Sequence, residues 1–394
     1  MSSSPKLLVV THNNLGASLS GGDRIFLNLI KYWQKSFNIE LLGCPEAIKL
    51  VRHFKLKPSI TPTISKPSRE NALNTQNLFW HHFSRFISGF IFCLNHRKIF
   101  KQAKYIYTAS DFYGDFVFGL MAKIFNPKIT WLCGYYLLAP KPFDPKSPYI
   151  QNKHFFRGLI YYLAQLPTVL IAKKMADFVF VTSTPDQKVF SATKSLVIQG
   201  GVYIPSTKII KSLKPFNTRK YDALYIGRLH SQKGVMEMID IWRKVVDVLP
   251  HAILSIIGDG ELMNEMISKI KQNNLSKNII VVGFMIGKKK FDIVRESKII
   301  LHPATYDSGG MAAAEAMAWG LPGVSFDLEA LKTYYPKGMV KTPCFDKDKF
   351  AKNIVDLLTN QKTYQQYSRE ARQLIISRWN WKKRLHKIYQ SITN

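Results

Sequence analysis

Short apolar runs alternate with longer amphipathic stretches along the whole chain. KLLVV (residues 6–10) precedes two glycines and the helix-like DRIFLNLIKYWQ. Comparable strand-like runs recur in the first half at residues 39–44, 105–110, 129–134 and 177–183, and in the second half at residues 222–227, 252–258, 278–283 and 298–304. Strands that alternate with helices predict parallel sheets covered by helices. The two series therefore predict an α/β chain with two Rossmann-like, doubly wound domains.

A basic, aperiodic stretch with two prolines, residues 204–222, separates the two series. Such a composition is typical of a linker, so we expect domains at residues 1–204 and 205–375. Residues 58–74 are rich in Pro, Ser and Thr and predict a loop. The segment after residue 376 carries Trp379, Trp381, Leu385 and Tyr389 at helical spacing, which predicts one amphipathic helix.

The charge is strongly basic, with 56 Lys and Arg against 26 Asp and Glu and a net charge of +30. The first 214 residues hold 28 of these basic residues and only 9 acidic ones. A basic surface attracts nucleic acid or an anionic membrane, although a lysine-rich composition alone also produces this balance. The basic residues are scattered and form no recognition module, so we expect no nucleic-acid partner.

Four cysteines (Cys44, Cys93, Cys133 and Cys344) lie far apart without metal-type spacing. They indicate neither a zinc site nor a disulfide framework, and they fit a reducing cytoplasm. The N-terminal residues show no signal-peptide pattern. We therefore expect a cytoplasmic protein.

Two aromatic-rich segments with basic flanks, residues 77–100 and 155–175, are shorter or more polar than a spanning helix requires. Their composition suits helices that lie in a membrane interface, and it equally suits core helices of an α/β domain. For the first segment both interpretations stay open, so peripheral attachment to the inner face of the membrane is an alternative. The second segment contains Pro167, and we expect it in the core.

GRLHSQKG (residues 227–234) follows a predicted strand and precedes the helix-like VMEMIDIWRKVV. A strand–loop–helix unit presents free backbone N–H groups at the loop, where anions bind. Arg228 and Lys233 add two cations, which suit a diphosphate. The alternative is an ordinary solvated basic turn.

A second loop, around Asp307, Gly309 and Gly310, leads into the helix-forming AAAEAMAW, which contains Glu315. Glycines allow a ligand to approach the backbone, and the two carboxylates could bind hydroxyl groups of a sugar and a ribose. The alternative is a helix-capping Asp and a surface Glu.

Taken together, GRLxxxKG, IIGDGE, VVGF and an acidic residue separated by seven residues from the Glu of EAMAxGLP occur here in this order. This series resembles the C-terminal domain of retaining glycosyltransferases of the GT-B fold, family-4 type (glycosyl transferases group 1). The resemblance implies two domains facing across a cleft, with a final helix, about residues 376–394, that crosses back to the first domain.

The resemblance also implies roles for individual residues. Arg228 and Lys233 would bind the donor diphosphate, with Gly22 behind it, and Glu315 would bind the ribose. The remaining donor-binding candidates lie beside the base or the transferred sugar: Phe284, Met285, Gly309, Gly310 and Met311. Asp307 would contact the sugar, although the family usually has the longer Glu at this position.

Three further candidates lie in the first domain. The family often has a reactive-centre His where this chain has Cys133, and Asp111 follows a predicted strand and could contact the acceptor. His12, in the first strand–helix loop, could substitute for the missing His. A structural role is an equally good interpretation for each of them, because catalytic work would need matched geometry.

The function that these residues predict is retaining transfer of a hexose-type sugar from a nucleotide diphosphate sugar to a glycan or lipid-linked acceptor. Two cations can stabilise the leaving diphosphate, so we expect no metal and no other cofactor. The DKD at residues 346–348 is better explained as a helix start than as a metal motif. The alternatives are a non-catalytic, membrane-associated binding subunit that retains the fold, or a sugar-nucleotide epimerase.

Overall fold

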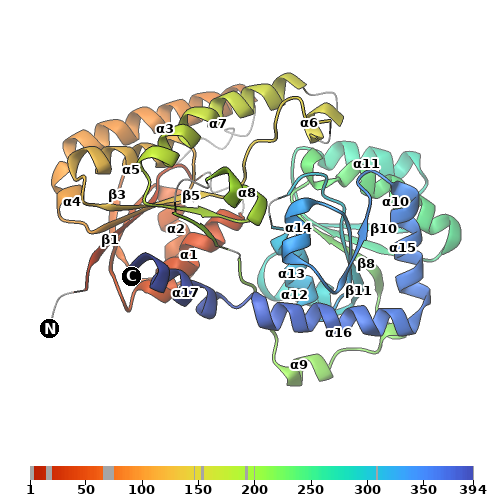
Figure 1. The fold of residues 1–394 in the computed structure, drawn as a ribbon. Helices are drawn as coiled ribbons and strands as arrows, with labels where there is room; N and C mark the ends of the chain where they lie inside the picture. The colour runs from red at the N-terminus through yellow and green to blue at the C-terminus, as the bar shows by residue number, and fades with distance from the viewer. Residues whose placement is uncertain are drawn as a thin grey trace. The chain divides into compact units, whose positions relative to one another are not determined.

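The computed structural model describes residues 4–14, 20–64, 75–145, 147–151, 155–190, 194–198, 200–307 and 309–393. The chain forms two compact units (Figure 1). Unit 1 comprises Met1–Pro142, Phe155–Gly200 and Trp381–Asn394, and unit 2 comprises Phe143–His154 and Gly201–Asn380. Each unit is an α/β sandwich with its own core.

Unit 1 contains a seven-stranded parallel sheet in the order β3-β2-β1-β4-β5-β6-β7. Its central strands are almost entirely buried, as expected where helices cover both faces of a parallel sheet. The strands are β1 (Lys6–Thr11), β2 (Asn38–Gly43), β3 (Ser59–Pro62), β4 (Tyr105–Thr108), β5 (Thr130–Tyr135), β6 (Phe178–Val181) and β7 (Lys194–Val197).

Helices cover both faces of this sheet, with α3, α5 and α7 above it and α1, α2 and α17 below it in Figure 1. The N-terminus of α1 is fixed by a capping box, in which Ser20 and Asp23 exchange side-chain-to-backbone hydrogen bonds. The helices of unit 1 are α1 (Gly21–Trp33), α2 (Pro45–His53), α3 (Thr75–Asn95), α4 (Arg97–Lys101), α5 (Tyr113–Phe125), α7 (Phe155–Met175), α8 (Thr184–Val189) and α17 (Trp381–Thr393).

Unit 2 contains a six-stranded parallel sheet in the order β10-β9-β8-β11-β12-β13. The strands are β8 (Tyr221–Ile226), β9 (Leu254–Ile257), β10 (Ile279–Gly283), β11 (Ser297–His302), β12 (Gly323–Phe326) and β13 (Met339–Thr342). The helices are α6 (Pro148–Gln151), α9 (Thr207–Lys211), α10 (Val235–Val248), α11 (Met263–Gln272), α12 (Gly287–Arg295), α13 (Met311–Met317), α14 (Glu329–Tyr334), α15 (Lys347–Thr359) and α16 (Gln361–Arg378), together with the 3-10 turns η1 (Phe216–Thr218) and η2 (Ser231–Lys233).

The predicted strands and the two doubly wound sheets are confirmed, with shifts of one or two residues at strand ends. The region expected to be a loop at residues 58–74 is partly wrong, because residues 59–62 form the edge strand β3, while residues 65–74 lie outside the described part. The Asp346 side chain caps α15 by accepting a hydrogen bond from the backbone of Lys349, as expected of a helix start.

The single amphipathic helix expected after residue 376 is divided in the structure. Helix α16 ends at Arg378 and α17 begins at Trp381. Trp379 packs against Tyr334 and Tyr335 in unit 2, whereas the backbone of Leu385 accepts a hydrogen bond from the Trp33 indole in unit 1. Trp379 and Leu385 therefore pack in different units, which helical spacing alone could not show.

Gly119 on α5 allows the indole of Trp131 on β5 to lie directly against the helix backbone. We expect Gly119→Ala to destabilise the protein by about 1–3 kcal/mol, because its methyl group would overlap the buried indole. Chemical denaturation measures this change. Gly21→Ala is the control, since nothing lies within 4 Å of a methyl group there; an equal loss in both variants would contradict the prediction.

Candidate functional site

The candidate site in unit 2 lies where β8 and β11 are neighbours although they are not consecutive strands. The helix connections reverse direction at this point, and ligands of such sheets bind at the carboxyl ends of the two strands. The loop after β11 hydrogen-bonds to the loop after β8, since the N–H groups of Thr305 and Tyr306 both donate to the Gln232 carbonyl at 3.0 and 3.2 Å. Gly234, with φ of 65°, is required because a side chain would overlap the Pro303 carbonyl.

This arrangement brings together Lys233, which we expected to bind a diphosphate, and Asp307, which we expected to contact the attached sugar. The Lys233 Nζ lies 2.9 Å from Asp307 Oδ2, and His302 Nε2 lies 3.0 Å from the same oxygen. Burial alone would raise the pKa of Asp307, but Lys233 and His302 outweigh it and hold the pKa well below its usual range. The Asp307 carboxylate is therefore ionised at neutral pH.

Glu315, on α13, forms a second and more deeply buried ion pair. Its Oε2 lies 2.8 Å from the Nζ of Lys290 on α12, and each side chain is only 6% exposed. Removing either partner of such a buried pair destabilises the fold, because the remaining charge would be buried without a partner of opposite sign. Glu315 is therefore held in place by its buried partner rather than being a surface residue.

The turn between Asp307 and α13 is held by the backbone. Gly310 has φ of 57°, and a side chain there would lie 3.1 Å from His302 Nε2. The Tyr335 hydroxyl donates to the Gly310 carbonyl at 2.6 Å, and the Gly309 N–H donates to Asp307 Oδ1 at 3.3 Å. Met311 begins α13 and is half-buried.

The remaining donor-binding candidates of unit 2 are more accessible. Arg228 is exposed in the loop after β8, where its backbone carbonyl accepts a hydrogen bond from the Tyr225 hydroxyl at 3.0 Å. Phe284 is exposed and Met285 is half-buried in the turn after β10, which Gly283 enters with φ of 80°. All three follow the carboxyl ends of strands in the same sheet as Lys233 and Asp307.

In unit 1 the corresponding point, between β1 and β4, is closed by internal hydrogen bonds. Asp115 Oδ1 accepts from the backbone N–H groups of His12 and Asn13 at 2.7 and 2.8 Å. The His12 ring contacts Thr63 Oγ1 at 2.7 Å and the Arg85 carbonyl at 2.9 Å. Burial lowers the pKa of His12 to about 3, with a further lowering from Arg85, so the ring is a neutral, fully buried part of the fold.

Asp111 is half-buried after β4 and accepts a hydrogen bond from Gln165 Nε2 at 2.7 Å. Burial raises its pKa to about 6, against the opposing effect of that hydrogen bond. Cys133 is fully buried among the apolar side chains of unit 1, and burial raises the pKa of its thiol. This position favours packing over contact with a substrate.

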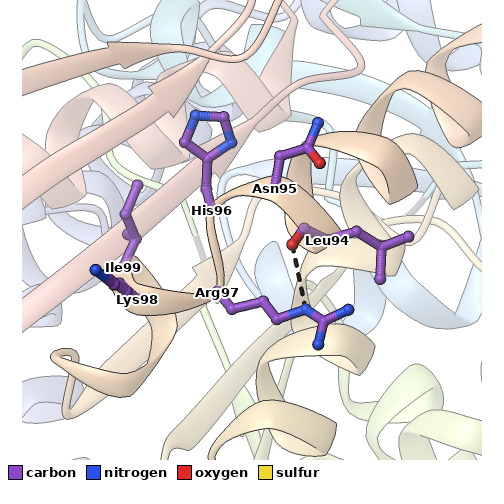
Figure 2. Close-up of a pocket in the computed structure, with 6 residues that line it drawn as sticks. All are labelled: Leu94, Asn95, His96, Arg97, Lys98 and Ile99. Carbon is purple, nitrogen blue, oxygen red and sulfur yellow. Dashed lines mark hydrogen bonds between the residues drawn. The ribbon is translucent and has the colours of Figure 1, made fainter.

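Gly22 lies in the first turn of α1, where a methyl group on its α-carbon would lie 3.4 Å from the Tyr136 ring. It belongs to unit 1, together with His12, Asp111 and Cys133, whereas the other candidates belong to unit 2. No group of three or more potential metal ligands occurs among the residues that the structure describes. A surface hollow lies elsewhere in unit 1, lined by Leu94–Ile99 and free of candidate site residues (Figure 2).

Comparison with known proteins gives the same assignment for unit 2. Residues 206–374 match the family model described as Glycosyl transferases group 1. This segment is a group 1 glycosyltransferase domain. Two relatives are an uncharacterized glycosyltransferase of Methanocaldococcus jannaschii, MJ1069 (26% identity, 57% of this chain and 58% of that protein), and the UDP-Gal:alpha-D-GlcNAc-diphosphoundecaprenol alpha-1,3-galactosyltransferase of Escherichia coli (25% identity, 41% and 43%). The alignments thus span about half of these relatives.

Solved structures extend the likeness to the whole chain. The Anabaena protein HepE, in complex with UDP and glucose, superposes with a TM-score of 0.66 at 15% identity and 99% coverage of both chains. A variant of S. aureus TarM superposes with a TM-score of 0.70 at 13% identity, covering 99% of this chain and all of that one. The chain therefore has the GT-B fold of these glycosyltransferases.

Three residues around the candidate site of unit 2 were not predicted from the sequence: His302, Lys290 and Tyr335. His302 is the last residue of β11, so its place at a strand end was a usable signal. Lys290 is the third residue of a KKK run, and nothing in that run distinguishes the buried lysine from its exposed neighbours. Tyr335 is distant in sequence from the turn it supports.

Removal of Lys290 tests the buried pair. We expect Lys290→Met to lower the free energy of unfolding by about 3–5 kcal/mol, because Glu315 would keep a buried charge without its partner. The double variant Lys290→Met/Glu315→Leu should recover most of this loss, since no charge then remains buried. Urea denaturation of both variants checks the prediction, and additive losses would show that the pair is not coupled.

The low pKa of His12 predicts a pH dependence. Between pH 6.5 and about 3 the unfolded chain binds a proton at His12 that the folded protein does not, so stability is present above pH 6.5 and is lost as pH falls. From pH 7 to pH 5 this amounts to about 2 kcal/mol. We expect His12→Gln, although less stable at pH 7, to lose about 2 kcal/mol less than the wild type over this range. Urea unfolding at pH 7 and pH 5 measures the free energies of both proteins, and an equal loss in the variant and the wild type would contradict the prediction.

Proposed function

We propose that the protein is a retaining glycosyltransferase that moves a hexose-type sugar from a nucleotide diphosphate sugar to a glycan or lipid-linked acceptor. The observation that carries the proposal is the 2.9 Å contact between Lys233 and Asp307. In such a donor a single oxygen joins the sugar to the diphosphate. A diphosphate-binding cation and a sugar-binding carboxylate must therefore lie side by side, as these two residues do.

The other contacts follow from the same loops. Arg228, exposed in the loop that contains Lys233, supplies the second cation for the diphosphate, because a guanidinium can bind phosphate oxygens in a bidentate manner. Glu315, which Lys290 holds in place, accepts hydrogen bonds from the ribose hydroxyls. Phe284 and Met285 lie beside the base, and Gly309, Gly310 and Met311 contact the sugar.

The proposed chemistry is a substitution at the anomeric carbon. The bond from this carbon to the phosphate oxygen breaks, and negative charge develops on the departing diphosphate. Lys233 and Arg228 stabilise that charge without a metal or any other cofactor. The acceptor hydroxyl bonds to the carbon on the same face, which gives retention, and its proton passes to the leaving diphosphate. Asp307, already ionised, binds the sugar and faces the positive charge that develops on its ring.

Features of similar proteins support the donor and acceptor classes. HepE was solved with UDP and with UDP-glucose, and the E. coli relative is named for a UDP-sugar donor and a lipid diphosphate acceptor. Asp111, with a pKa raised to about 6 and a position after a strand of unit 1, is our candidate for contact with the acceptor. Gly22 keeps the place behind the diphosphate that the family resemblance implies, whereas the buried Cys133 is assigned no contact with a substrate. A site at the membrane surface on the cytoplasmic side would suit a lipid-linked acceptor.

Nucleotide binding by paired variants tests the proposal. We expect one member of a panel of UDP, GDP and ADP to raise the melting temperature of the wild type. Lys233→Ala should bind that nucleotide about 10- to 100-fold more weakly, the effect of losing one charge-assisted hydrogen bond. Calorimetric titration measures the affinity. Release of the nucleotide from the matching sugar donor then separates turnover from binding alone, and the sugar product separates transfer from epimerisation.

Lys298→Ala provides a matched control in the same sheet. Lys298 pairs with Asp222 at 2.6 Å, and both residues lie at the amino ends of β11 and β8, opposite the proposed site. This variant also removes one lysine of a lysine–aspartate pair, but it should leave nucleotide affinity unchanged. Equal affinity in Lys233→Ala and the wild type would show that the proposed diphosphate site is wrong.

A further inference from the structure

The outer face of α7 exposes large apolar side chains between basic residues near its two ends, Arg157 and Lys173–Lys174. Phe156, Ile160, Leu163 and Leu170 follow one another at spacings of three, four or seven residues and are 76%, 66%, 54% and 58% exposed. This finding corrects the expectation that the segment lies in the core. Among the described residues, α7 is also the helix with the length and composition of a membrane span.

Helix α3 presents a second exposed apolar stripe. It consists of Trp80, Phe83, Ile87, Phe90 and Ile91, all at least 38% exposed. Tyr113 at the start of α5 contacts both helices, since its ring packs against Phe86 of α3 and its hydroxyl donates to the Ala164 carbonyl of α7 at 2.7 Å. The two stripes are therefore parts of the same helical layer of unit 1 (Figure 1).

The charges on this layer have one sign. The sequences of α3, α4 and α7 contain no Asp or Glu. Exposed basic residues stand at the C-terminal end of each stripe: Arg97, Lys98 and Lys101 on α4, and Lys173 and Lys174 on α7. Figure 2 shows Arg97 and Lys98 of the first group at the hollow of the α3–α4 junction, where the Arg97 Nε donates to the Leu94 carbonyl.

We propose that this layer, defined by the exposed residues of α3 and α7 and the basic residues that end them, docks on an anionic phospholipid bilayer. Apolar side chains that are this exposed are unfavourable in water, and their transfer to the acyl region of a membrane lowers the free energy. The lysines and arginines then meet the lipid phosphates. A nucleic acid would not require the apolar stripes, and a protein partner would not require charges of one sign only.

The inner face of α7 shows that the helix lies on the bilayer and does not span it. Gln165 donates to Asp111 and to the Leu137 carbonyl and accepts from the Ala139 N–H, and Thr168 accepts from the Tyr135 hydroxyl at 2.5 Å. These buried polar contacts join α7 to unit 1. A spanning helix would have to break them in a medium that offers no replacement partners.

The proposal deepens the proposed function, because a bilayer surface is where a lipid-linked acceptor is found, but it does not depend on donor chemistry. The probe is a set of vesicles of phosphatidylcholine with or without phosphatidylglycerol, mixed with the full-length protein. We expect cosedimentation with the phosphatidylglycerol vesicles that weakens as ionic strength rises from about 0.05 to 0.5 M, because salt screens the lysine–phosphate attraction.

The apolar contribution is tested by Leu163→Glu/Leu170→Glu, which should lower vesicle partitioning at least about tenfold. Val248→Glu/Ile376→Glu is the matched control: both of its apolar residues lie in unit 2 and are similarly exposed, at 61% and 46%. The variant Lys173→Gln/Lys174→Gln should bind more weakly and with a smaller salt dependence. Nucleotide-induced stabilisation, measured on every variant, should remain unchanged, so a failure of donor binding would affect only the proposed function.

Three outcomes would overturn the proposal. The first is wild-type protein that does not bind anionic vesicles, or binds them no better than the α7 double variant. The second is a wild-type dimer that the α7 variant converts to a monomer in sedimentation velocity, which would make the layer a protein interface. The third is membrane-bound protein that high salt and carbonate cannot extract, which would make α7 a spanning segment.

Discussion

The parallel pairing of β8 with β11 is the constraint on which the candidate site of unit 2 depends. These strands are neighbours in the sheet although two strand–helix units separate them in sequence, so their carboxyl ends place residues 228–234 beside residues 303–310. The 74-residue separation between Lys233 and Asp307 then becomes a contact of 2.9 Å. Gly234 makes the approach possible, since any side chain there would overlap the Pro303 carbonyl. The Lys233–Asp307 pair and the turn that leads into α13 thus both depend on β8 and β11 being neighbours.

The two units use the same topology in different ways. In unit 1 the neighbours β1 and β4 also have their carboxyl ends side by side. There the Asp115 carboxylate already accepts hydrogen bonds from the backbone N–H groups of His12 and Asn13. In unit 2 the equivalent carboxylate, Asp307, is held by side chains, one of which is a flexible lysine. A lysine can exchange its partner for a phosphate, whereas a backbone N–H in a fixed loop cannot move. The difference in partners explains why one point is structural and the other suits a ligand.

The central strands, the loop after β8 and the turn before α13 could be predicted from the sequence because local patterns encode them, whereas the order of the strands in each sheet could not. Apolar runs of four to six residues mark the central strands, and glycines mark turns that need positive φ or close approach. The short edge strands β3, β7 and β13 lack such runs and were missed. Lys290, His302 and Tyr335 were missed for another reason, since their partners lie 5 to 25 residues away and only the tertiary fold joins them. The break between α16 and α17 at residues 379–380 was missed for the same reason, since the two helices pack in the cores of different units.

Charge and apolar exposure have to be considered together in unit 1. The net charge alone would fit any anionic partner, and the hydrophobicity of residues 155–175 alone would fit a core helix. The structure separates these possibilities, because Gln165 and Thr168 face inward with hydrogen-bond partners while the leucines of the same helix face outward. A helix with its polar atoms satisfied inside and its apolar atoms in water is the reverse of a soluble surface helix. A bilayer against the outer face, as proposed above, would suit these exposed leucines, and the absence of any Asp or Glu on α3, α4 and α7 favours an anionic one.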